Sequence, residues 1–261
     1  MRYLLILFIC LQSFLLKADE IYNLIKIPNL EVFKLNSELG INFLHTKKDI
    51  IFGAKKNIQC NKINKNNLQK KFKIVSKNLN KYKADFLLKN NLKFLILCEN
   101  LLISGINTGG IPNHNKKTLI IDINFNPLYF ERMMHHEIFH MIQNSNKDFF
   151  NENYWASLNN SNFIYSECST CSDRLGLDIN EKTNGFLTDY SKSIPSEDMA
   201  EIFSFLMINN KNAKNKIQND NILISKMEYL ISSLKKIDEN FSFKWLKKLK
   251  LLSLKNYYFF F

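Results

Sequence analysis

The spacing of apolar residues predicts helices and short strands in the N-terminal half of the chain. Between Asn61 and Tyr82, apolar residues recur every three to five positions in a polar background, which is typical of an amphipathic helix. Two short apolar runs, Phe94–Cys98 and Thr118–Ile123, predict β-strands. Glycine and proline residues between these runs indicate a turn-rich loop, so this half is expected to mix helix with sheet.

Helical periods dominate the C-terminal half. Asn126 followed by Pro127 has the pattern of a helix N-cap with proline at the first helical position, and the apolar stripe behind it runs to about Asn144. Residues 145–181 carry no clear period and are expected to be irregular. A further helix follows Pro195.

The pattern from residue 222 to residue 252 is again helical by period. The last five residues, 257–261, are all aromatic, and we expect them to dock on the domain's own core, with an interaction tail as the alternative. With neither an internal repeat nor a linker in the sequence, residues 19–261 predict a single α+β domain.

Residues 1–18 have the organisation of a signal peptide. A short positive stretch at Met1 and Arg2 precedes an uncharged, mostly apolar run that reaches Leu16. The run is shorter than a membrane span but fits the hydrophobic region of a signal peptide. We expect cleavage after Ala18 and a periplasmic or secreted mature chain without a membrane span; an uncleaved anchor is the alternative.

Composition excludes two classes of protein. With 46% hydrophobic and 13% aromatic residues, the chain is not an intrinsically disordered one. The net charge of +12 does not indicate a nucleic-acid binder, because only three of the 36 basic residues are arginine and lysine lacks the fork that contacts bases and phosphates. Loss of residues 1–18 leaves 34 basic against 24 acidic residues, which we interpret as a solvated basic surface.

Four cysteines follow the signal peptide, and in an exported chain an even number favours disulfides. Cys168 and Cys171 lie close in sequence without the βαβ surroundings of a thioredoxin-like site, so we expect them to pair. Cys60 and Cys98 then form the second candidate pair by elimination. A four-cysteine zinc site is the alternative, with only one close pair in its favour.

The helix after Pro127 carries a His-Glu-x-x-His motif, from His136 to His140. Residues four apart project from nearly the same face of an α-helix, so both imidazoles can reach one tetrahedral Zn²⁺. Glu137 flanks that face and can reach a metal-bound water without being a ligand. His135 points about 100° away from its neighbour and is expected to be an adjacent or supporting group. An ordinary histidine pair is the alternative.

A hydrolytic zinc site needs one more protein ligand and keeps a position for water. The best candidates lie at the start of the helix after Pro195, where Glu197 and Glu201 share a face. One can bind the metal while the other accepts the free N–H of a ligand histidine. Stabilisation of the helix N-terminus is the alternative role of such acids, and Asp198 and His114 are the next candidates for the ligand.

Three segments together resemble a known family. His135–His140, Gly185–Tyr190 and Pro195–Glu201 are similar to the exported zinc-binding metallopeptidases of bacteria, which are of the gluzincin type, and more distantly to the catalytic domain of anthrax lethal factor. The resemblance covers roughly residues 92–209. It implies a zincin-like fold in which a small mixed sheet packs on the His-Glu-x-x-His helix, with a helical C-terminal part.

The resemblance also implies a role for each candidate residue. It assigns the Zn²⁺ ligands to His136, His140 and Glu197. Glu201 then supports a ligand histidine, Glu137 acts as the general base and Tyr190 donates a hydrogen bond to the developing oxyanion. The prediction is an exported zinc metallopeptidase that acts on peptides or proteins. The alternative is an envelope protein that binds zinc or a partner on this scaffold and hydrolyses nothing.

Overall fold

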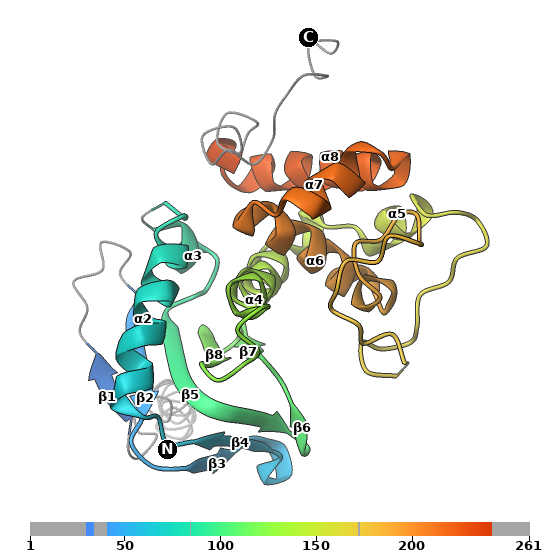
Figure 1. Ribbon diagram of the computed structural model, residues 1–261. Helices are drawn as coiled ribbons and strands as arrows, with labels where there is room; N and C mark the ends of the chain where they lie inside the picture. Colours follow the sequence, from blue (N-terminus) through green and yellow to red (C-terminus); the bar gives the residue numbers. More distant parts are fainter. Residues whose placement is uncertain (1–29, 34–40, 84, 172, 242–261) are drawn as a thin grey trace, which may run out of the picture.

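The computed structural model describes residues 30–33, 41–83, 85–171 and 173–241 (Figure 1). The expected signal peptide and the aromatic C-terminal residues lie outside these ranges. No helix within them has the length and the apolar character that crossing a bilayer requires. The strands are β1 (Leu30–Phe33), β2 (Asn42–Thr46), β3 (Ile50–Phe52), β4 (Ile58–Asn61), β5 (Phe94–Ile103), β6 (Ile106–Asn107), β7 (Gly110–Asn113) and β8 (Thr118–Asp122).

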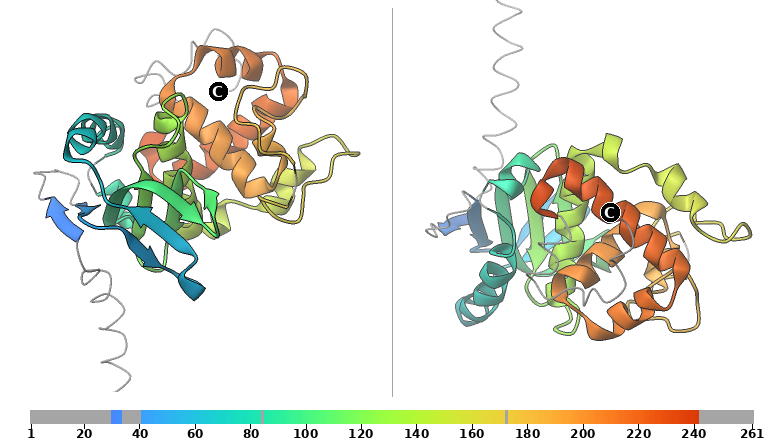
Figure 2. Two further views of the ribbon diagram at one scale, coloured as in Figure 1. Left: turned by 60° about the horizontal axis from the view of Figure 1, so that its bottom comes forward. Right: turned by 90° about the horizontal axis from the view of Figure 1, so that it is seen from above.

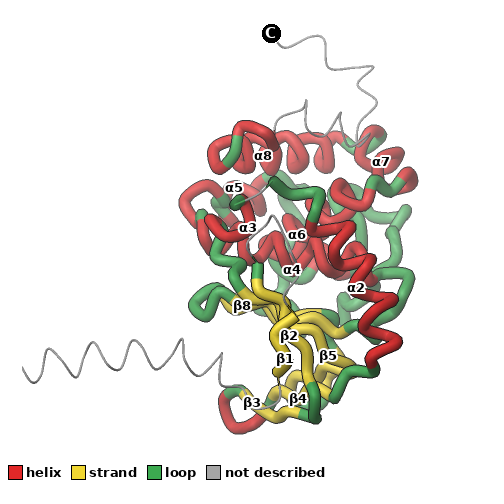
Figure 3. The backbone as a smooth tube through the Cα atoms, turned by 90° about the vertical axis from the view of Figure 1, so that its left-hand side faces the viewer, coloured by secondary structure: helices red, strands yellow, loops and turns green. Residues whose placement is uncertain are grey.

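The helices follow between and after the strands. They are α2 (Lys65–Leu79), α3 (Phe86–Lys89), α4 (Phe130–Ser145), α5 (Glu152–Ser157), α6 (Pro195–Ile208), α7 (Lys211–Gln218) and α8 (Asn221–Ile237). Short 3₁₀ turns occur at η1 (Ala54–Lys56), η2 (Lys147–Phe149), η3 (Tyr190–Lys192) and η4 (Glu239–Phe241). The helices and the strands gather in two regions of the molecule (Figure 3). This arrangement confirms the predicted mixture of a small sheet with a helical C-terminal part.

The long strand β5 is shared by two parts of one mixed sheet. Its first half pairs in parallel with β2 and β8, and the antiparallel strands β1 and β7 form the edges of this part. Its second half pairs antiparallel with β4 and β6, and β4 pairs with β3. The bend of β5 between the two parts is visible in Figure 1. The edge strand β7 lies beside α4, which brings the sheet to the motif helix.

Alternating side chains of β5 serve two apolar clusters, because successive residues of a strand point to opposite faces. Leu95 and Leu97 join the large core beneath the helices. Phe94, Ile96 and Cys98 join a smaller cluster that also includes residues of β3 and β4. The face that packs on helices is therefore the face that supports α4.

Helix α4 lies between the sheet and α6, and α7 and α8 follow beyond α6 (Figure 1). Helix α2, teal in Figure 2, also packs against α4. Every side chain from Glu197 to Met207 in α6 is buried, so this helix is enclosed on all sides. Pro195 stands at its first position, and Asn209 ends it in the left-handed conformation with φ 59°.

The start of α4 differs from the prediction. The helix begins at Phe130, three residues after Pro127, because the Asn126 side chain accepts the N–H of Leu128 and closes a turn instead of capping the helix. Helix α2 is also shorter than predicted, since Asn64 caps it by accepting the N–H of Asn66.

Two further predictions about the C-terminal half need correction. The segment 145–181, expected to be irregular, contains η2 and α5. The sequence pattern predicted a helix from residue 222 to residue 252, but α8 ends at Ile237. The backbone is extended at Asp238, which terminates the helix. Residues beyond 241 lie outside the described ranges.

Both expected disulfides are present. Cys60 of β4 is joined to Cys98 of β5, with a Cα–Cα distance of 5.8 Å, and both side chains are buried. Cys168 is joined to Cys171 with a Cα–Cα distance of 5.2 Å, in a loop at the surface. One bridge thus lies inside the sheet and the other in solvent.

Candidate metal and catalytic centre

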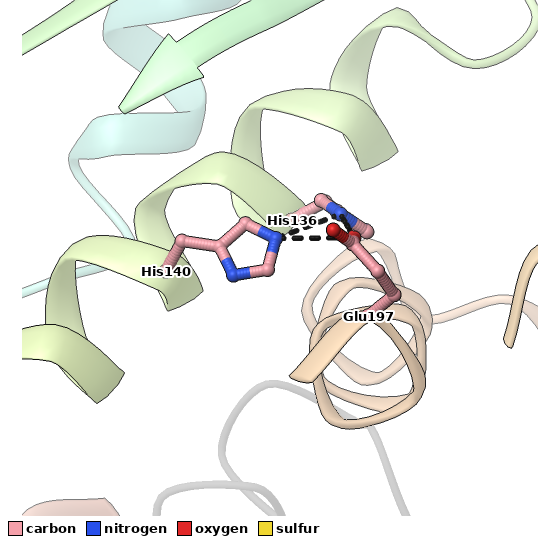
Figure 4. Close-up of side chains that lie close together, drawn as sticks. All are labelled: His136, His140 and Glu197. Atoms are coloured by element: carbon pink, nitrogen blue, oxygen red, sulfur yellow. Dashed lines mark hydrogen bonds and ion pairs between the residues drawn. The ribbon is translucent and has the colours of Figure 1, made fainter. Parts of the chain in front are cut away.

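Three side chains from α4 and α6 converge on one point (Figure 4). The Nε2 atoms of His136 and His140 are 3.1 Å apart, and Glu197 Oε2 lies 2.7 and 3.2 Å from them, respectively. Within the described ranges this is the one group of three or more histidine, cysteine or acidic residues that could hold an ion. The two histidines are one turn apart on α4, and Glu197 faces them from the first turn of α6.

The separations of these atoms fit a tetrahedral metal. Donor atoms at zinc–ligand distances of 2.0–2.2 Å and at tetrahedral angles lie about 3.3–3.6 Å from one another. The observed separations of 2.7–3.2 Å are a little shorter than that range, and each ring presents a nitrogen, not a carbon, to the common point. Two imidazoles with one carboxylate are also a donor set that suits Zn²⁺.

The charges around this point fit a divalent cation as well. Glu137, Glu197 and Glu201 gather near the two histidines, and the Arg132 guanidinium is paired with Glu201. Because histidine ligates a metal in its neutral form, the cluster carries two negative charges more than positive ones. Uncompensated buried charge is costly, and a divalent ion would neutralise it. Both geometry and charge therefore fit Zn²⁺.

The ring of His136 is oriented from behind by Glu201. Its Nδ1–H donates to Glu201 Oε1 at 3.0 Å. The other ring nitrogen, Nε2, is therefore left to face the ligand point, which is the point where His136, His140 and Glu197 converge. The other carboxylate oxygen, Oε2, accepts hydrogen bonds from Arg132 and, at 2.8 Å, from the Thr188 hydroxyl. Arg132 in turn donates to the Leu177 carbonyl at 2.9 Å. The rotamer of one histidine is thus fixed by a chain of buried groups.

Neighbouring charges keep the two acids of α6 ionised. Burial alone raises the pKa of Glu197, but the adjacent His140 and His136 lower it below its ordinary value. Burial also raises the pKa of Glu201, but the Arg132 charge together with His136 and Thr188 outweighs burial, so that the net shift is downward. Burial lowers the pKa of His136, yet the hydrogen bonds and charges of both acids raise it to about 10.

Glu137 is partly buried beside the edge strand β7. A Cβ atom at Gly110 would lie 2.6 Å from Cγ of Glu137, so the strand approaches the acid this closely only because glycine has no side chain. Burial raises the pKa of Glu137 above its ordinary value. The sequence motif locates this acid, but it does not reveal the glycine that leaves room for it.

Tyr190 lies beside His136, with 5.9 Å between the ring centroids. It opens η3, and burial together with the charges of Glu197 and Glu137 raises its pKa well above the ordinary value. The hydroxyl therefore stays protonated and able to donate. The structure brings all of the candidate site residues together: His136, Glu137, His140, Tyr190, Glu197 and Glu201.

The structure places other candidates elsewhere. His135 is fully buried on the other face of α4, where Nδ1 hydrogen-bonds to the Tyr82 hydroxyl at 2.7 Å and Nε2 to Asn78 at 2.9 Å. Of the two roles expected for His135, the structure agrees with that of a neighbour that is not a ligand, because the 100° offset points it at α2. His114 pairs with Asn91 at 2.6 Å, outside the site.

Asp198, the other alternative ligand, belongs to a buried charge pair next to the site. Its Oδ2 accepts hydrogen bonds from Lys226 of α8 at 2.6 Å, from Trp155 at 2.8 Å and from Tyr165 at 2.7 Å. Lys226 also donates to the Gly185 carbonyl at 2.7 Å. The residue after Glu197 thus attaches the first turn of α6 to α8, α5 and two loops.

Sequence reasoning missed Arg132, Thr188 and Lys226. Arg132 stands one turn before His136 on the motif helix, which is a signal that could have been used. Asp198, the partner of Lys226, is 28 residues away in the sequence, and no local sequence pattern predicts such a pair.

Comparison with known proteins identifies the family to which the chain belongs. Residues 111–248, more than half of the sequence, match the model of the family described as "putative zinc-binding metallo-peptidase". The chain belongs to this metallo-peptidase family. The matched range includes α4, α6 and every candidate residue of the site.

The fold is shared with a solved structure, "a putative zinc-binding metallo-peptidase from Bacteroides caccae ATCC 43185". That protein is 18% identical, with a TM-score of 0.51 over 85% of this chain and 91% of the other. The predicted family and fold class are confirmed, whereas the more distant likeness to anthrax lethal factor stays a prediction. Comparison with curated proteins gives no match.

Proposed function

We propose that the chain is an exported zinc-dependent peptidase that hydrolyses peptide bonds in peptides or proteins. The observation that carries this proposal is the convergence of His136, His140 and Glu197 on one point with Glu137 beside it. Membership of a metallo-peptidase family supports the same reaction class. The two disulfides support an oxidising compartment, such as the periplasm or the exterior.

His136, His140 and Glu197 would hold the zinc ion. When bound there, Zn²⁺ acts as a Lewis acid that acidifies a water molecule and polarises a substrate carbonyl. Glu201 contributes by keeping the His136 proton on Nδ1, so that Nε2 stays available as a ligand. Arg132 and Thr188 keep Glu201 in place by occupying its second oxygen.

Glu137 is placed to move the proton that peptide hydrolysis requires. It takes a proton from the attacking water and delivers it to the nitrogen of the leaving amine. Its partly buried position and raised pKa suit both steps, because an acid with a higher pKa accepts a proton more readily. The Tyr190 hydroxyl donates a hydrogen bond to the carbonyl oxygen as negative charge develops on it.

The edge strand β7 supports an extended peptide as the substrate. In the described part of the chain β7 pairs with β8 on one side alone, and Gly110 of this strand lies against Glu137. Unpaired backbone groups of an edge strand accept an added strand through main-chain hydrogen bonds. A peptide bound there would pass the general base.

The proposal is tested by replacing Glu137 with glutamine in the full chain. Glu137→Gln keeps a side chain of the same size but removes the base, so we expect turnover of a peptide library to fall about 10²–10⁴-fold. Zinc content measured by mass spectrometry should stay near one ion per chain. Glu131→Gln on the same helix is the matched control, since Glu131 pairs with Asn78 of α2 and not with the site.

Unchanged turnover in zinc-loaded Glu137→Gln would contradict the proposed role of the base. A wild-type chain that retains zinc and cleaves nothing in the library would favour the alternative of a non-catalytic zinc-binding envelope protein.

A further inference from the structure

A surface segment closed by the exposed disulfide lies against the turn that carries Tyr190. We define it as the disulfide segment, residues 164–171 and 173–176. Its two ends are attached to η3: the Ser166 N–H donates to the Ser193 carbonyl at 2.7 Å, and the Tyr190 N–H donates to the Gly176 carbonyl at 3.0 Å. The segment is therefore anchored to the Tyr190 turn on both sides of its disulfide.

Arg174 adds a third attachment within the same segment. One nitrogen, Nη1, donates to the Ile164 carbonyl at 3.2 Å and to the Lys192 carbonyl at 2.7 Å. Lys192 ends η3, so the guanidinium joins the beginning of the disulfide segment to the last residue of the Tyr190 turn. Movement of the segment is thus expected to move the turn.

The disulfide ring itself reaches the candidate catalytic hydroxyl. Ser169, between Cys168 and Cys171, lies at the Tyr190 hydroxyl, where its side chain lowers the pKa of Tyr190 by hydrogen bonding against the larger raising effect of burial. The Tyr190 ring meanwhile rests against His136. One side of the tyrosine is therefore held by the metal site and its hydroxyl end by the disulfide ring.

We propose that the disulfide segment is a positioning element for the Tyr190 hydroxyl, so that opening the Cys168–Cys171 bridge lowers turnover without releasing the metal. The proposal rests on the proposed function, because it assigns a purpose to the position of Tyr190. Ser169 acts through Tyr190 and is a positioning residue, since nothing places it at the reacting atoms.

The two disulfides differ in their access to a reductant. Cys60 and Cys98 are 1% and 0% exposed, whereas Cys171 is exposed and Cys168 is partly so. A dithiol reductant attacks one sulfur of the exposed bridge as a thiolate and forms a mixed disulfide. Its second thiol then displaces the remaining cysteine, so the dithiol becomes a cyclic disulfide while the bridge gains two electrons and two protons. The buried bridge stays closed under the same mild conditions.

Loss of the ring frees Ser169 from Tyr190 and loosens the hydroxyl that donates to the oxyanion. Misplacement of a catalytic group by about 1 Å costs up to 100-fold in rate, and loss of one oxyanion donor costs about 10²–10³-fold. For a donor that is loosened but present we expect kcat to fall about 10-fold. KM should change little, because the substrate contacts themselves remain.

The first experiment reduces the native full-length protein with a mild dithiol. Alkylation and intact mass should show two new thiols, with Cys60–Cys98 intact. The zinc content should not change, and kcat should fall and recover on reoxidation. Hydrogen exchange supplies a readout that needs no activity: the amides of Ser166 and Tyr190 should exchange faster after reduction, because their acceptors lie across the loosened contact.

The second experiment leaves the bridge intact and compares Ser169→Ala with Thr170→Ala in the same ring. We expect Ser169→Ala to lower kcat roughly 3- to 10-fold, in line with a loosened donor, and Thr170→Ala to have no effect. In a Tyr190→Phe background neither Ser169→Ala nor reduction should lower kcat further, because the group they position is gone.

A rise in kcat on reduction would overturn the proposal, since it would mean that the ring competes for the hydroxyl. Unchanged amide exchange and unchanged kcat after verified reduction would overturn it as well. Additive losses in the Tyr190→Phe background would show a general structural effect instead. If the oxidised wild type cleaves nothing, the proposed function fails, while amide exchange still decides whether the segment positions the turn.

Discussion

Glu197 and Glu201 are the same residue type one turn apart, and their surroundings give them different tasks. Glu197 Oε2 faces both histidine nitrogens at the ligand point. Glu201 presents Oε1 to the back of His136 and gives Oε2 to Arg132 and Thr188. The two acids are therefore distinguished by what their oxygens contact: Glu197 faces the histidine nitrogens that would bind the metal, and Glu201 faces the back of His136.

Exchanging each acid for glutamine should separate the two tasks. Glu197→Gln removes a direct ligand, so zinc should be lost to a mild chelator and catalysis should be abolished. Glu201→Gln should keep the metal and lose about 10–100-fold in affinity or activity, as expected for a group that orients a ligand. Zinc retention against a graded chelator series measures both. The reverse order would make Glu201 the ligand.

Gly110 offers a test of the general base from outside the motif. In Gly110→Ala the new Cβ would lie 2.6 Å from Cγ of Glu137, so the acid must leave its present position. We expect kcat to fall about 10–100-fold, the cost of displacing a catalytic group, with zinc content unchanged. Asn113→Ala at the other end of β7 is the control. Full activity in Gly110→Ala would show that Glu137 tolerates the displacement.

The motif residues could be predicted because their relation is local, whereas the supporting residues could not. His136 and His140 are fixed by the pitch of one helix. Arg132 meets Glu201 across 69 positions and Gly110 meets Glu137 across 27, and such pairs are set by packing of whole elements. Tyr190 was located by resemblance and not by its surroundings.

At the scale of elements, the first turn of α6 is held by charge as well as by packing. Lys226 and Asp198 are both fully buried, and the pair joins α8 to α6 directly after Glu197. Burial lowers the pKa of Lys226, and the Asp198 charge opposes that shift. Two buried ions stabilise a fold only as long as each has the other.

Removal of one member of the Lys226–Asp198 pair should therefore destabilise the fold. Lys226→Met leaves the Asp198 carboxylate without its cation, and we expect the free energy of unfolding to fall by about 3–5 kcal/mol. Urea unfolding measures this loss. Adding Asp198→Asn should restore part of it, because the uncompensated charge disappears. A Lys226→Met chain as stable as the wild type would show that the pair adds nothing.

Some of the helices and strands could be predicted from the sequence, and others could not. The apolar stripes of α4 and α6 predicted both helices, but the apolar runs within β2 and β4 are too short to stand out. Strand β5 continues past Glu99 because it changes partners from β8 to β4. The helical period runs across Ile237 without a break, whereas α8 ends there, since a period describes a helix face without marking its end. Boundaries were decided by single polar side chains such as Asn64 and Asn126.

At the scale of the whole molecule, the site lies where two parts of the chain meet. The sheet and α4 come from the part that ends at Ser145, and α6 with α7 and α8 comes from the part that begins at Pro195. The fold class followed from the sequence because it depends on the alternation of patterns. The meeting of the two parts did not, since it depends on how α4 and α6 pack.

Because the candidate ligands lie on two helices far apart in sequence, the site can be completed only after both helices have been synthesised. The two histidines are available once α4 has formed, but Glu197 follows 57 residues after His140. Closing so long a loop carries an entropic cost that packing of α6 on α4 must offset. A truncated or half-folded chain therefore displays the complete His-Glu-x-x-His motif and still lacks a metal site. Under the proposed function, hydrolytic competence is therefore a late event of folding, because it requires the chain to have reached α6 and to have packed it on α4.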